Sequence, residues 1–316
     1  MNLPPKATQP TLYFIGVTTT KSSIMKVFPL WAKALGLKDA VIKGIDIEIH
    51  AQPEVYRQVV EFIKEDELSM GALVTTHKID LYNATKDLFE YLDPYATMFG
   101  ELSSISKKEG RLEGYAKDPI SSGLSLEAFV PKNYWKRYGG EVLLLGAGGS
   151  AIAMSAYLLN KNKGDNIPSK LIVANRSKPR LDEIESIVKK INPGVPAEFH
   201  LTPDSVQNDA LVNKLKPHSL VVNATGLGKD RPGSPLTDAA QFPADSLIWE
   251  INYRGDLLFM HQALKQKEAK NLHVEDGWIY FVYGWTQVIA EVFHMSITGR
   301  LFDECEQIAN EIRKNG

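Results

Sequence analysis

Cysteine is almost absent from this sequence of 316 residues. The single cysteine, Cys305, cannot form an intrachain disulfide, so a reducing compartment is its natural setting. Long apolar runs are also missing, because the longest, 278–285, is far shorter than the roughly 20 residues that cross a bilayer. The first ten residues contain two adjacent prolines and no apolar stretch, unlike a signal peptide. We therefore expect a cytoplasmic protein.

An excess of charge of either sign is lacking too. With 36 basic and 38 acidic residues the formal charge is −2, which gives no electrostatic reason to expect nucleic acid or a membrane as partner. The content of hydrophobic residues, 44%, is ordinary for a globular protein, and the length predicts about two domains. We expect no metal ion, and the sequence leaves monomer and homodimer open.

Strands alternate with helices along the first third of the chain. The predicted strands are 11–17, 41–49 and 71–76, and the predicted helices are 22–35, 53–65 and 79–92. Ser22 is expected to cap the first helix and Gly36 to end it. A hairpin is predicted from 102–106 and 112–115. This alternation is typical of βαβ units around a mostly parallel sheet.

A stronger pattern begins at Glu141. The predicted strands are 142–145, 170–175, 219–224 and 246–251, with helices at 151–160 and 181–191. Beyond Asn252 the chain is expected to be helical, except for a loop around 274–277.

A glycine turn follows the apolar strand 142–145. Gly146-Ala147-Gly148-Gly149-Ser150-Ala151 fits the Gly-x-Gly-x-x-Ala form of the dinucleotide fingerprint. The first glycine permits the tight turn, the second lets the backbone approach a pyrophosphate, and the small last residue lets the helix pack closely. Phosphate would then bind at the helix N-terminus. The strand–turn–helix setting favours a dinucleotide site over a structural turn.

Basic residues stand where an NAD-binding unit usually has an acid. The strand 170–175 ends in Asn175-Arg176-Ser177-Lys178, and Arg180 follows. NAD-binding units hold the ribose 2′-hydroxyl with Asp or Glu at this point, whereas cations suit a 2′-phosphate. The pattern favours NADP over NAD, and the alternative is a solvated basic loop.

A third segment ends another predicted strand. Asn223-Ala224-Thr225 lies at the carboxyl edge of the sheet, where ligands of open α/β sheets bind, and its small side chains leave space for a ribose or nicotinamide. A plain polar turn explains these residues equally well.

These segments together resemble the shikimate dehydrogenase family, along nearly the whole chain. The segment 71–78, Gly-Ala-Leu-Val-Thr-Thr-His-Lys, is similar to the family's Asn-Val-Thr-x-Pro-x-Lys, shortened by one residue. The segment 114–118, Gly-Tyr-Ala-Lys-Asp, is similar to its Gly-Tyr-Asn-Thr-Asp. The resemblance implies an NADP-dependent dehydrogenase acting on a CH–OH group, and a link to aromatic amino acid biosynthesis.

The resemblance also implies a fold and a catalytic pair. We predict an α/β protein in which 1–118 and 256–316 form a substrate-binding domain and 119–255 a Rossmann-type NADP-binding domain, with the C-terminal helices returning to the first. Lys78 and Asp118 would be the catalytic pair. A lysine can take the hydroxyl proton as hydride leaves, and a carboxylate can orient it. Without the resemblance, Lys78 would be interpreted as a surface lysine and Asp118 as a helix N-cap.

The substrate segments depart from the family pattern. The family's Ser-x-Ser pair becomes Ser22-Ser23-Ile24, and three asparagines are replaced by Leu73, Ser103 and Ala116. When the two sequences are aligned without gaps, Gly284 stands where the family has a glutamine. Gln287 lies on the same helix face and can take the place of that glutamine. Thr75 and Tyr253 are retained. The predicted substrate-binding residues are Ser22, Ser23, Thr75, Tyr253 and Gln287.

These departures predict a substrate other than shikimate. A pocket without those amides would leave buried hydroxyls unpaired, at about 1–3 kcal/mol each. Quinate, an amino analogue or a more apolar cyclic hydroxy acid remain open, and one or two aromatic rings of the mainly core-forming run 278–285 could line the altered pocket. A non-catalytic NADP(H) or metabolite sensor is the alternative function. A methylenetetrahydrofolate-type dehydrogenase fits less well, because the segment 114–118 has no purpose there.

Overall fold

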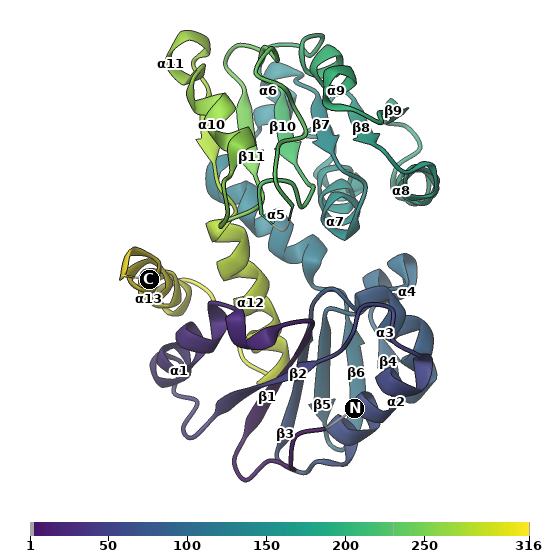
Figure 1. The fold of residues 1–316 in the computed structure, drawn as a ribbon, viewed down its shortest axis with the longest axis vertical. Coiled ribbons are helices and arrows are strands. Elements are labelled where there is room, and N and C mark those ends of the chain that lie inside the picture. Colours follow the sequence, from purple (N-terminus) through teal and green to yellow (C-terminus); the bar gives the residue numbers. More distant parts are fainter. Residues whose placement is uncertain (1–2, 230, 316) are drawn as a thin grey trace. The chain divides into compact units, whose positions relative to one another are not determined.

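The computed structural model describes residues 3–229 and 231–315 and divides the chain into two compact units (Figure 1). One unit holds the residues up to Lys117 together with those from Gly284 onward, and the other holds Asp118–Tyr283. Within the described residues, both units combine helices with a six-stranded sheet. The predicted α/β class is therefore confirmed.

The first unit is built on a mixed sheet with the order β2-β1-β3-β5-β6-β4. Its strands are β1 (Thr11–Gly16), β2 (Val41–Asp46), β3 (Ser69–Val74), β4 (Tyr91–Leu92), β5 (Ser104–Lys108) and β6 (Arg111–Tyr115). Its helices are η1 (Thr19–Lys21), α1 (Ile24–Ala34), α2 (Pro53–Glu65), α3 (Lys78–Thr85), η2 (Lys86–Leu88), α4 (Pro94–Phe99) and α13 (Arg300–Asn315). The division between the units falls within α12 (Trp278–Val292).

Strand β1 is buried throughout because both of its faces are covered. Tyr13 packs edge-on against Phe62 of α2, with ring centroids 5.4 Å apart, and Phe14 packs against Trp285 of α12 at 4.9 Å. Successive strand residues point to opposite faces, so these helices lie on opposite sides of the sheet. Trp31 of α1 donates a hydrogen bond of 2.7 Å to a carbonyl oxygen of α13. The C-terminal helices thus pack on the N-terminal sheet, as predicted.

The second unit contains a sheet whose described strands all run parallel, in the order β12-β11-β10-β7-β8-β9. Its strands are β7 (Val142–Leu145), β8 (Leu171–Asn175), β9 (Ala197–Leu201), β10 (Leu220–Asn223), β11 (Leu247–Glu250) and β12 (His273–Glu275). The chain moves outward from β7 to β9, then returns to β10 on the other side. This is the doubly wound Rossmann order, and ligands of such sheets bind where β7 and β10 diverge.

Helices cover both faces of this second sheet (Figure 1). They are α5 (Asp118–Phe129), α6 (Tyr134–Tyr138), α7 (Gly149–Leu158), η3 (Lys161–Lys163), α8 (Lys178–Ile191), α9 (Ser205–Val212), α10 (Leu258–Leu264) and α11 (Lys267–Lys270). Val212 of α9 and Phe259 of α10 join the core on the face of Ile248. Phe129 of α5 packs on the opposite face, against Trp249. The apolar strands are therefore buried on both sides, which explains their continuous apolar pattern.

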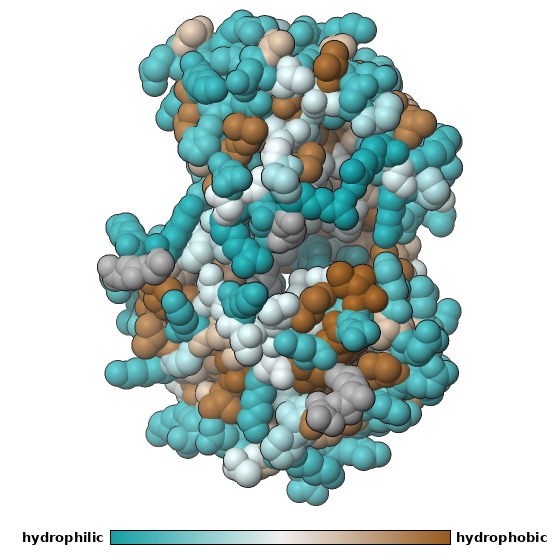
Figure 2. Space-filling model, viewed as in Figure 1, coloured by the Kyte–Doolittle hydropathy of each residue, from teal (hydrophilic) through white to brown (hydrophobic). Residues whose placement is uncertain are grey.

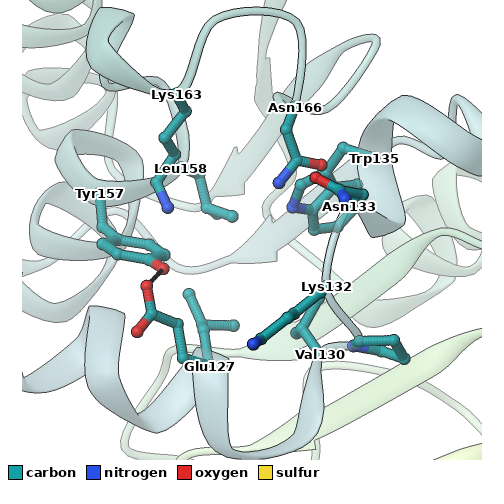
Figure 3. A pocket seen from close by; sticks show the side chains of 11 residues that line it. Glu127, Val130, Lys132, Asn133, Trp135, Tyr157, Leu158, Lys163 and Asn166 are labelled. Carbon is teal, nitrogen blue, oxygen red and sulfur yellow. Dashed lines mark hydrogen bonds between the residues drawn. The ribbon is translucent and has the colours of Figure 1, made fainter.

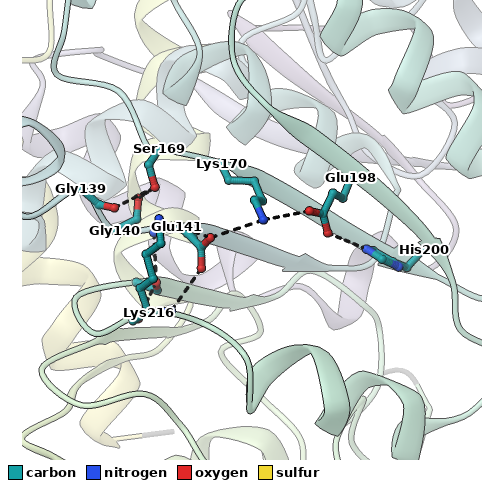
Figure 4. A network of polar contacts seen from close by, with 9 residues as sticks. Gly139, Gly140, Glu141, Ser169, Lys170, Glu198, His200 and Lys216 are labelled. Carbon is teal, nitrogen blue, oxygen red and sulfur yellow. Dashed lines mark hydrogen bonds and ion pairs between the residues drawn. The ribbon is translucent and has the colours of Figure 1, made fainter.

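A polar network lies at the amino ends of β7 and β8 and extends along β9 (Figure 4). The ammonium of Lys170 lies 3.7 Å from Glu141 and 2.8 Å from Glu198, which also contacts His200 at 3.0 Å. Glu141 is buried and accepts the backbone N–H of Lys216 at 3.1 Å. This edge is opposite the carboxyl ends, so the network stabilises the sheet and leaves the ligand-binding edge to other residues.

The apolar residues of α12 pack inward. Trp278, Phe281, Val282 and Trp285 are buried at the spacing of one helix face, so half of the run 278–285 forms core, whereas we had expected most of it to do so. The face of the molecule drawn in Figure 2 is mainly hydrophilic over both units. No helix in the described part of the chain is long and apolar enough to cross a membrane.

Two predicted elements of the first unit differ in the structure. The helix predicted at 79–92 ends at Thr85, whose hydroxyl bonds back to the carbonyl of Leu81 at 2.6 Å, and β4 pairs with β6 instead. Ser22 ends a 3₁₀ turn, and Ser23 precedes α1 without a side-chain cap. Gly36, with φ of +71°, follows the end of α1 as expected.

The third difference concerns residues 256–283. The loop predicted around 274–277 contains part of β12, which pairs in parallel with β11. These residues therefore belong to the compact unit of the Rossmann sheet, whereas we had assigned them to the other domain. A three-residue edge strand forms only where a neighbouring strand supplies its hydrogen bonds, and that neighbour is not visible in a local pattern.

Candidate functional site

The glycine turn lies at the carboxyl end of β7, beside the point where β7 and β10 diverge. Gly146 has φ of +117°, and a Cβ there would lie 2.6 Å from the carbonyl oxygen of Ala224, so the turn requires glycine. At Gly148 the space that a Cβ would occupy is open, which leaves the backbone accessible. Helix α7 starts at Gly149 without a side-chain cap, and its first N–H groups suit a phosphate. Ala151 is fully buried against the sheet.

A cavity of about 740 Å³ opens from this turn, and we call it the glycine-turn cavity. It is lined by the carboxyl ends of β7, β8 and β10 and the loops that follow them. Its volume suits a small-molecule or cofactor site. Among the predicted cofactor residues, its lining contains Gly146, Gly148, Asn175, Arg176, Ser177, Arg180, Ala224 and Thr225. It also contains residues that the sequence analysis missed, including Asp204 and Arg231.

The basic residues after β8 differ in their ion-pair partners and in whether they line the cavity. The ammonium of Lys178 is paired with Asp182 one turn along α8, and Lys178 does not line the cavity. Arg180 lines the cavity and bonds Glu183 at 2.8 Å. Arg176 lines the cavity, and within residues 3–229 and 231–315 it has no carboxylate partner. Arg176 is thus the residue of this loop best placed to bind an anion.

The remaining predicted cofactor residues lie behind the cavity lining. Gly149, Ser150 and Ala151 form the first turn of α7, and Asn223 is fully buried. The Asn223 side-chain oxygen accepts hydrogen bonds from the N–H and the hydroxyl of Thr225, at 3.1 and 2.6 Å. Asn223 therefore shapes the cavity edge without being part of its surface.

A buried carboxylate supports this edge. Glu250 is fully buried and accepts a bond of 2.7 Å from the Asn223 amide, while its other oxygen accepts from the N–H and amide of Asn252, at 2.9 and 2.6 Å. Burial raises the pKa of Glu250 to about 7, because desolvation outweighs these donated hydrogen bonds. The sequence analysis missed Glu250, since it stands in an apolar strand without a recognisable motif.

Lys78 of the first unit begins α3 directly after a strained turn. Thr76 has φ of +62°, which is unfavourable for a β-branched residue and persists only where the surroundings enforce it. His77 is buried, burial lowers its pKa, and its Nδ1 lies 3.2 Å from the hydroxyl of Tyr56. The N–H of Thr75 donates to the carbonyl of Ile15 at 3.0 Å. The backbone that presents Lys78 is thus held from several sides.

The other predicted residues fall in separate places. Ser22 and Ser23 are half-buried between η1 and α1. Gln287 lines a cavity of about 390 Å³ within the first unit, together with the ion pair Lys117–Glu291, whose charged atoms are 2.6 Å apart. Asp118 begins α5 in the second unit.

Comparisons with known proteins give related sequences. Over 176 residues the chain is 29% identical to the shikimate dehydrogenase (NADP(+)) of Lactococcus lactis subsp. cremoris, covering 55% of this chain and 58% of that enzyme. Over 219 residues it is 26% identical to the shikimate dehydrogenase (NADP(+)) of Nitrosopumilus maritimus, covering 69% of this chain and 71% of that enzyme. The chain thus spans less than two thirds of the length of the Lactococcus relative, and no protein-family model matches it.

Solved structures share the fold over nearly the whole chain. Shikimate dehydrogenase from Aquifex aeolicus superposes with a TM-score of 0.70 at 19% identity, covering 98% of this chain and 100% of that one. Quinate dehydrogenase from Corynebacterium glutamicum, in complex with NAD, gives 0.72 at 18%, covering 96% and 99%. The 5-ketofructose reductase of a Gluconobacter strain gives 0.70 at 16%, with the same coverage.

This chain is similar in sequence to shikimate dehydrogenases, and it has the fold of solved shikimate and quinate dehydrogenases. In this chain, the positions that depart from the pattern of the shikimate dehydrogenase family are buried. Ile24 and Ala116 have no exposed surface, and Leu73 is 8% exposed. These side chains pack into the first unit. Ser103 is buried as well, and its hydroxyl accepts the N–H of Lys117 at 2.7 Å.

Tyr253 lies in an aromatic cluster. Its ring is 5.6 Å from that of Trp278 and 4.9 Å from that of Phe281, between centroids. Tyr253 is half-buried, whereas the two α12 rings are buried. These two rings of the run 278–285 therefore position Tyr253.

Proposed function

We propose that this protein is an NADP-dependent dehydrogenase that interconverts a cyclic hydroxy acid and its keto form. The observation that carries the proposal is the glycine-turn cavity, with the N-terminus of α7 at one side and Arg176 at another. No acid stands at the end of β8, where an NAD enzyme would need one. The relatives from Lactococcus and Nitrosopumilus are named as NADP(+) enzymes, which supports the same cofactor.

We assign roles to residues of both units. NADP, when bound, accepts the hydride. The turn Gly146–Ala151 would hold its pyrophosphate and Arg176 its 2′-phosphate, and the Asn223–Thr225 edge would face the ribose or nicotinamide. Lys78 would exchange a proton with the substrate hydroxyl, and Asp118 would orient Lys78. Ser22, Ser23, Thr75, Tyr253 and Gln287 would contact the substrate.

Arg176→Ala is expected to weaken NADPH binding by about 1–3 kcal/mol, the range for a hydrogen bond to a charged group. NADH has no 2′-phosphate, so its affinity should change little. Calorimetric titration of both cofactors measures the two effects directly.

Lys178→Ala is the matched control for this prediction. Lys178 is two residues away and carries the same charge, but its ammonium is paired with Asp182 outside the cavity lining. It should leave both affinities nearly unchanged. If Arg176→Ala weakened NADH and NADPH equally, Arg176 would not be the 2′-phosphate ligand.

We further propose that shikimate is a poor substrate. The family positions occupied by Ile24, Leu73 and Ala116 offer no polar side-chain group, so substrate hydroxyls would lose hydrogen-bond partners at about 1–3 kcal/mol each. The quinate dehydrogenase and the 5-ketofructose reductase have this fold and are named for other substrates, which agrees with a changed specificity.

A panel of cyclic hydroxy acids tests both the reaction and the specificity. The measurement is kcat/KM with NADP, followed by NADPH absorbance, for shikimate, quinate, an amino analogue and less hydroxylated acids. We expect a member other than shikimate to lead by at least about tenfold, one lost hydrogen bond being worth about that much. If shikimate had the highest kcat/KM of the panel, the proposed specificity would be refuted. NADPH binding without turnover of any member would indicate a sensor.

A further inference from the structure

A second cavity, of about 450 Å³, lies in the second unit (Figure 3). The last turns of α5 and α7, the segment into α6 and the loop after η3 surround it, and we call it the α5–α7 cavity. Its lining consists of Leu126, Glu127, Val130, Pro131, Lys132, Asn133, Trp135, Tyr157, Leu158, Lys163 and Asn166. No described residue lines both this cavity and the glycine-turn cavity. It is therefore a different site from the proposed cofactor site.

Flat apolar surfaces form part of its walls. The rings of Trp135 and Tyr157 stand on different sides of the cavity (Figure 3). Leu126 and Leu158 also line the cavity and are buried. Tyr157 is fixed in place, because its hydroxyl donates to Glu127 and its ring lies against Gly123 of α5. A Cβ at Gly123 would lie only 2.2 Å from that ring. A planar ligand would thus meet a wall that is already ordered.

Two cations extend into the same space. Lys132 and Lys163 both direct their ammonium groups into the cavity (Figure 3). The ammonium of Lys163 lies 3.6 Å from the centroid of the Tyr157 ring, and burial lowers the pKa of Lys163. Within the described chain neither ammonium has an ion-pair partner, and the carboxylate of Glu127 already accepts the Tyr157 hydroxyl. The lining thus carries two lysines and one carboxylate, Glu127, so its charged side chains leave an excess of positive charge.

Amide groups complete the polar lining. The side-chain oxygen of Asn166 accepts the N–H of Lys136 at 3.2 Å, which leaves its NH₂ group for another partner. Asn133 lies beside it at the Trp135 side (Figure 3). A hydroxyl or carboxylate oxygen of a ligand would find donors here in addition to the lysines. Apolar walls together with convergent polar groups, in a cavity of this size, are typical of a small-molecule site.

We propose that the α5–α7 cavity is a second ligand site, which binds a planar aromatic carboxylate. Its ring lies between Trp135 and Tyr157, and its carboxylate contacts Lys163 and Lys132. Both the ring and the charge are required: the walls select a flat body, and the unpaired ammonium groups select an anion.

The test is calorimetric titration of the full chain with benzoate and 4-hydroxybenzoate. Benzyl alcohol supplies the ring without the charge, and inorganic phosphate the charge without the ring. We expect the carboxylates to bind at least about tenfold more tightly than either probe, since a charge-assisted hydrogen bond contributes that much. Saturating NADPH should not displace them. Equal binding of benzyl alcohol or of phosphate, no binding of the carboxylates, or displacement by NADPH would each overturn the proposal.

Variants of the two cavity lysines test where the carboxylate of the ligand binds. Lys163→Met and Lys132→Met keep similar side-chain length, and each should weaken benzoate binding by about tenfold. Lys161→Met is the matched control, because Lys161 is exposed in the same loop but does not line the cavity. Since Lys132 is exposed, its variant should fold normally even if Lys163→Met does not. Unchanged benzoate affinity in Lys132→Met and in folded Lys163→Met would refute the assignment.

Discussion

Lys78→Met is expected to lower kcat by about 10²–10⁴-fold, the range for loss of a general acid–base group, without changing NADPH affinity. Lys78 begins α3 directly after the strained Thr76 and the buried His77, so its side chain extends from a rigid stretch of backbone. Methionine keeps the side-chain length and removes only the proton-carrying group. Single-turnover kinetics with the best substrate of the panel, together with NADPH titration, measure the two effects.

Asp118→Asn should behave similarly if the two residues act as one unit. The double variant should then be little worse than the worse single variant, because residues that act together are not additive. Lys86→Met is the control: Lys86 lies at the other end of α3, with its ammonium over the ring of Tyr82. Its activity should be unchanged. Fully multiplicative losses would show that Lys78 and Asp118 work independently.

The second large effect concerns stability and pH at Glu250. The pKa of this carboxyl is raised from 4.5 to about 7 in the folded chain. Between these values the unfolded chain releases the proton while the folded chain keeps it, so rising pH favours unfolding. The contribution of Glu250 to stability should therefore fall by about 3 kcal/mol from below pH 4.5 to above pH 7, at 1.36 kcal/mol per pKa unit.

Glu250→Gln isolates this contribution, because the amide does not titrate. The free energy of unfolding of the wild type minus that of Glu250→Gln should fall across this pH range in urea denaturation. Glu268→Gln, which changes an exposed carboxyl of α11, should show no such trend. A constant or rising difference for Glu250→Gln would contradict the prediction. Glutamine keeps one acceptor oxygen and exchanges the other for an NH₂ donor, so the hydrogen bonds from the Asn223 and Asn252 amides cannot both be kept. This should also loosen the Thr225 edge and weaken NADPH binding.

Elements with strong local patterns were predicted well. The strand 142–145 matches β7 and the helix 53–65 matches α2, because continuous apolar runs and helical periodicity are local signals. The elements β9, α9 and β12 were missed. They are short and lie at or beside the edges of the sheet, where fewer side chains are buried. Their hydrogen bonds come from strands distant in sequence.

The sequence by itself determined the chemistry of the glycine turn. Gly146, the N-terminus of α7 and the basic residue after β8 follow one another along the chain, so a local motif specifies them. The structure decided which of the basic residues reach the cavity: Arg176 and Arg180 line it, whereas Lys178 pairs with Asp182 outside it. That choice depends on side-chain pairing, which residue type does not reveal.

Only the tertiary structure brought together Asn223, Thr225 and Glu250. Glu250 follows Asn223 by 27 positions and meets it because β10 and β11 pair in parallel register. The α5–α7 cavity has the same origin, since Lys132 and Lys163 are far apart in sequence and share a space only when α5 packs on α7. Burial and the direction of side chains arise from packing, and a linear pattern carries neither.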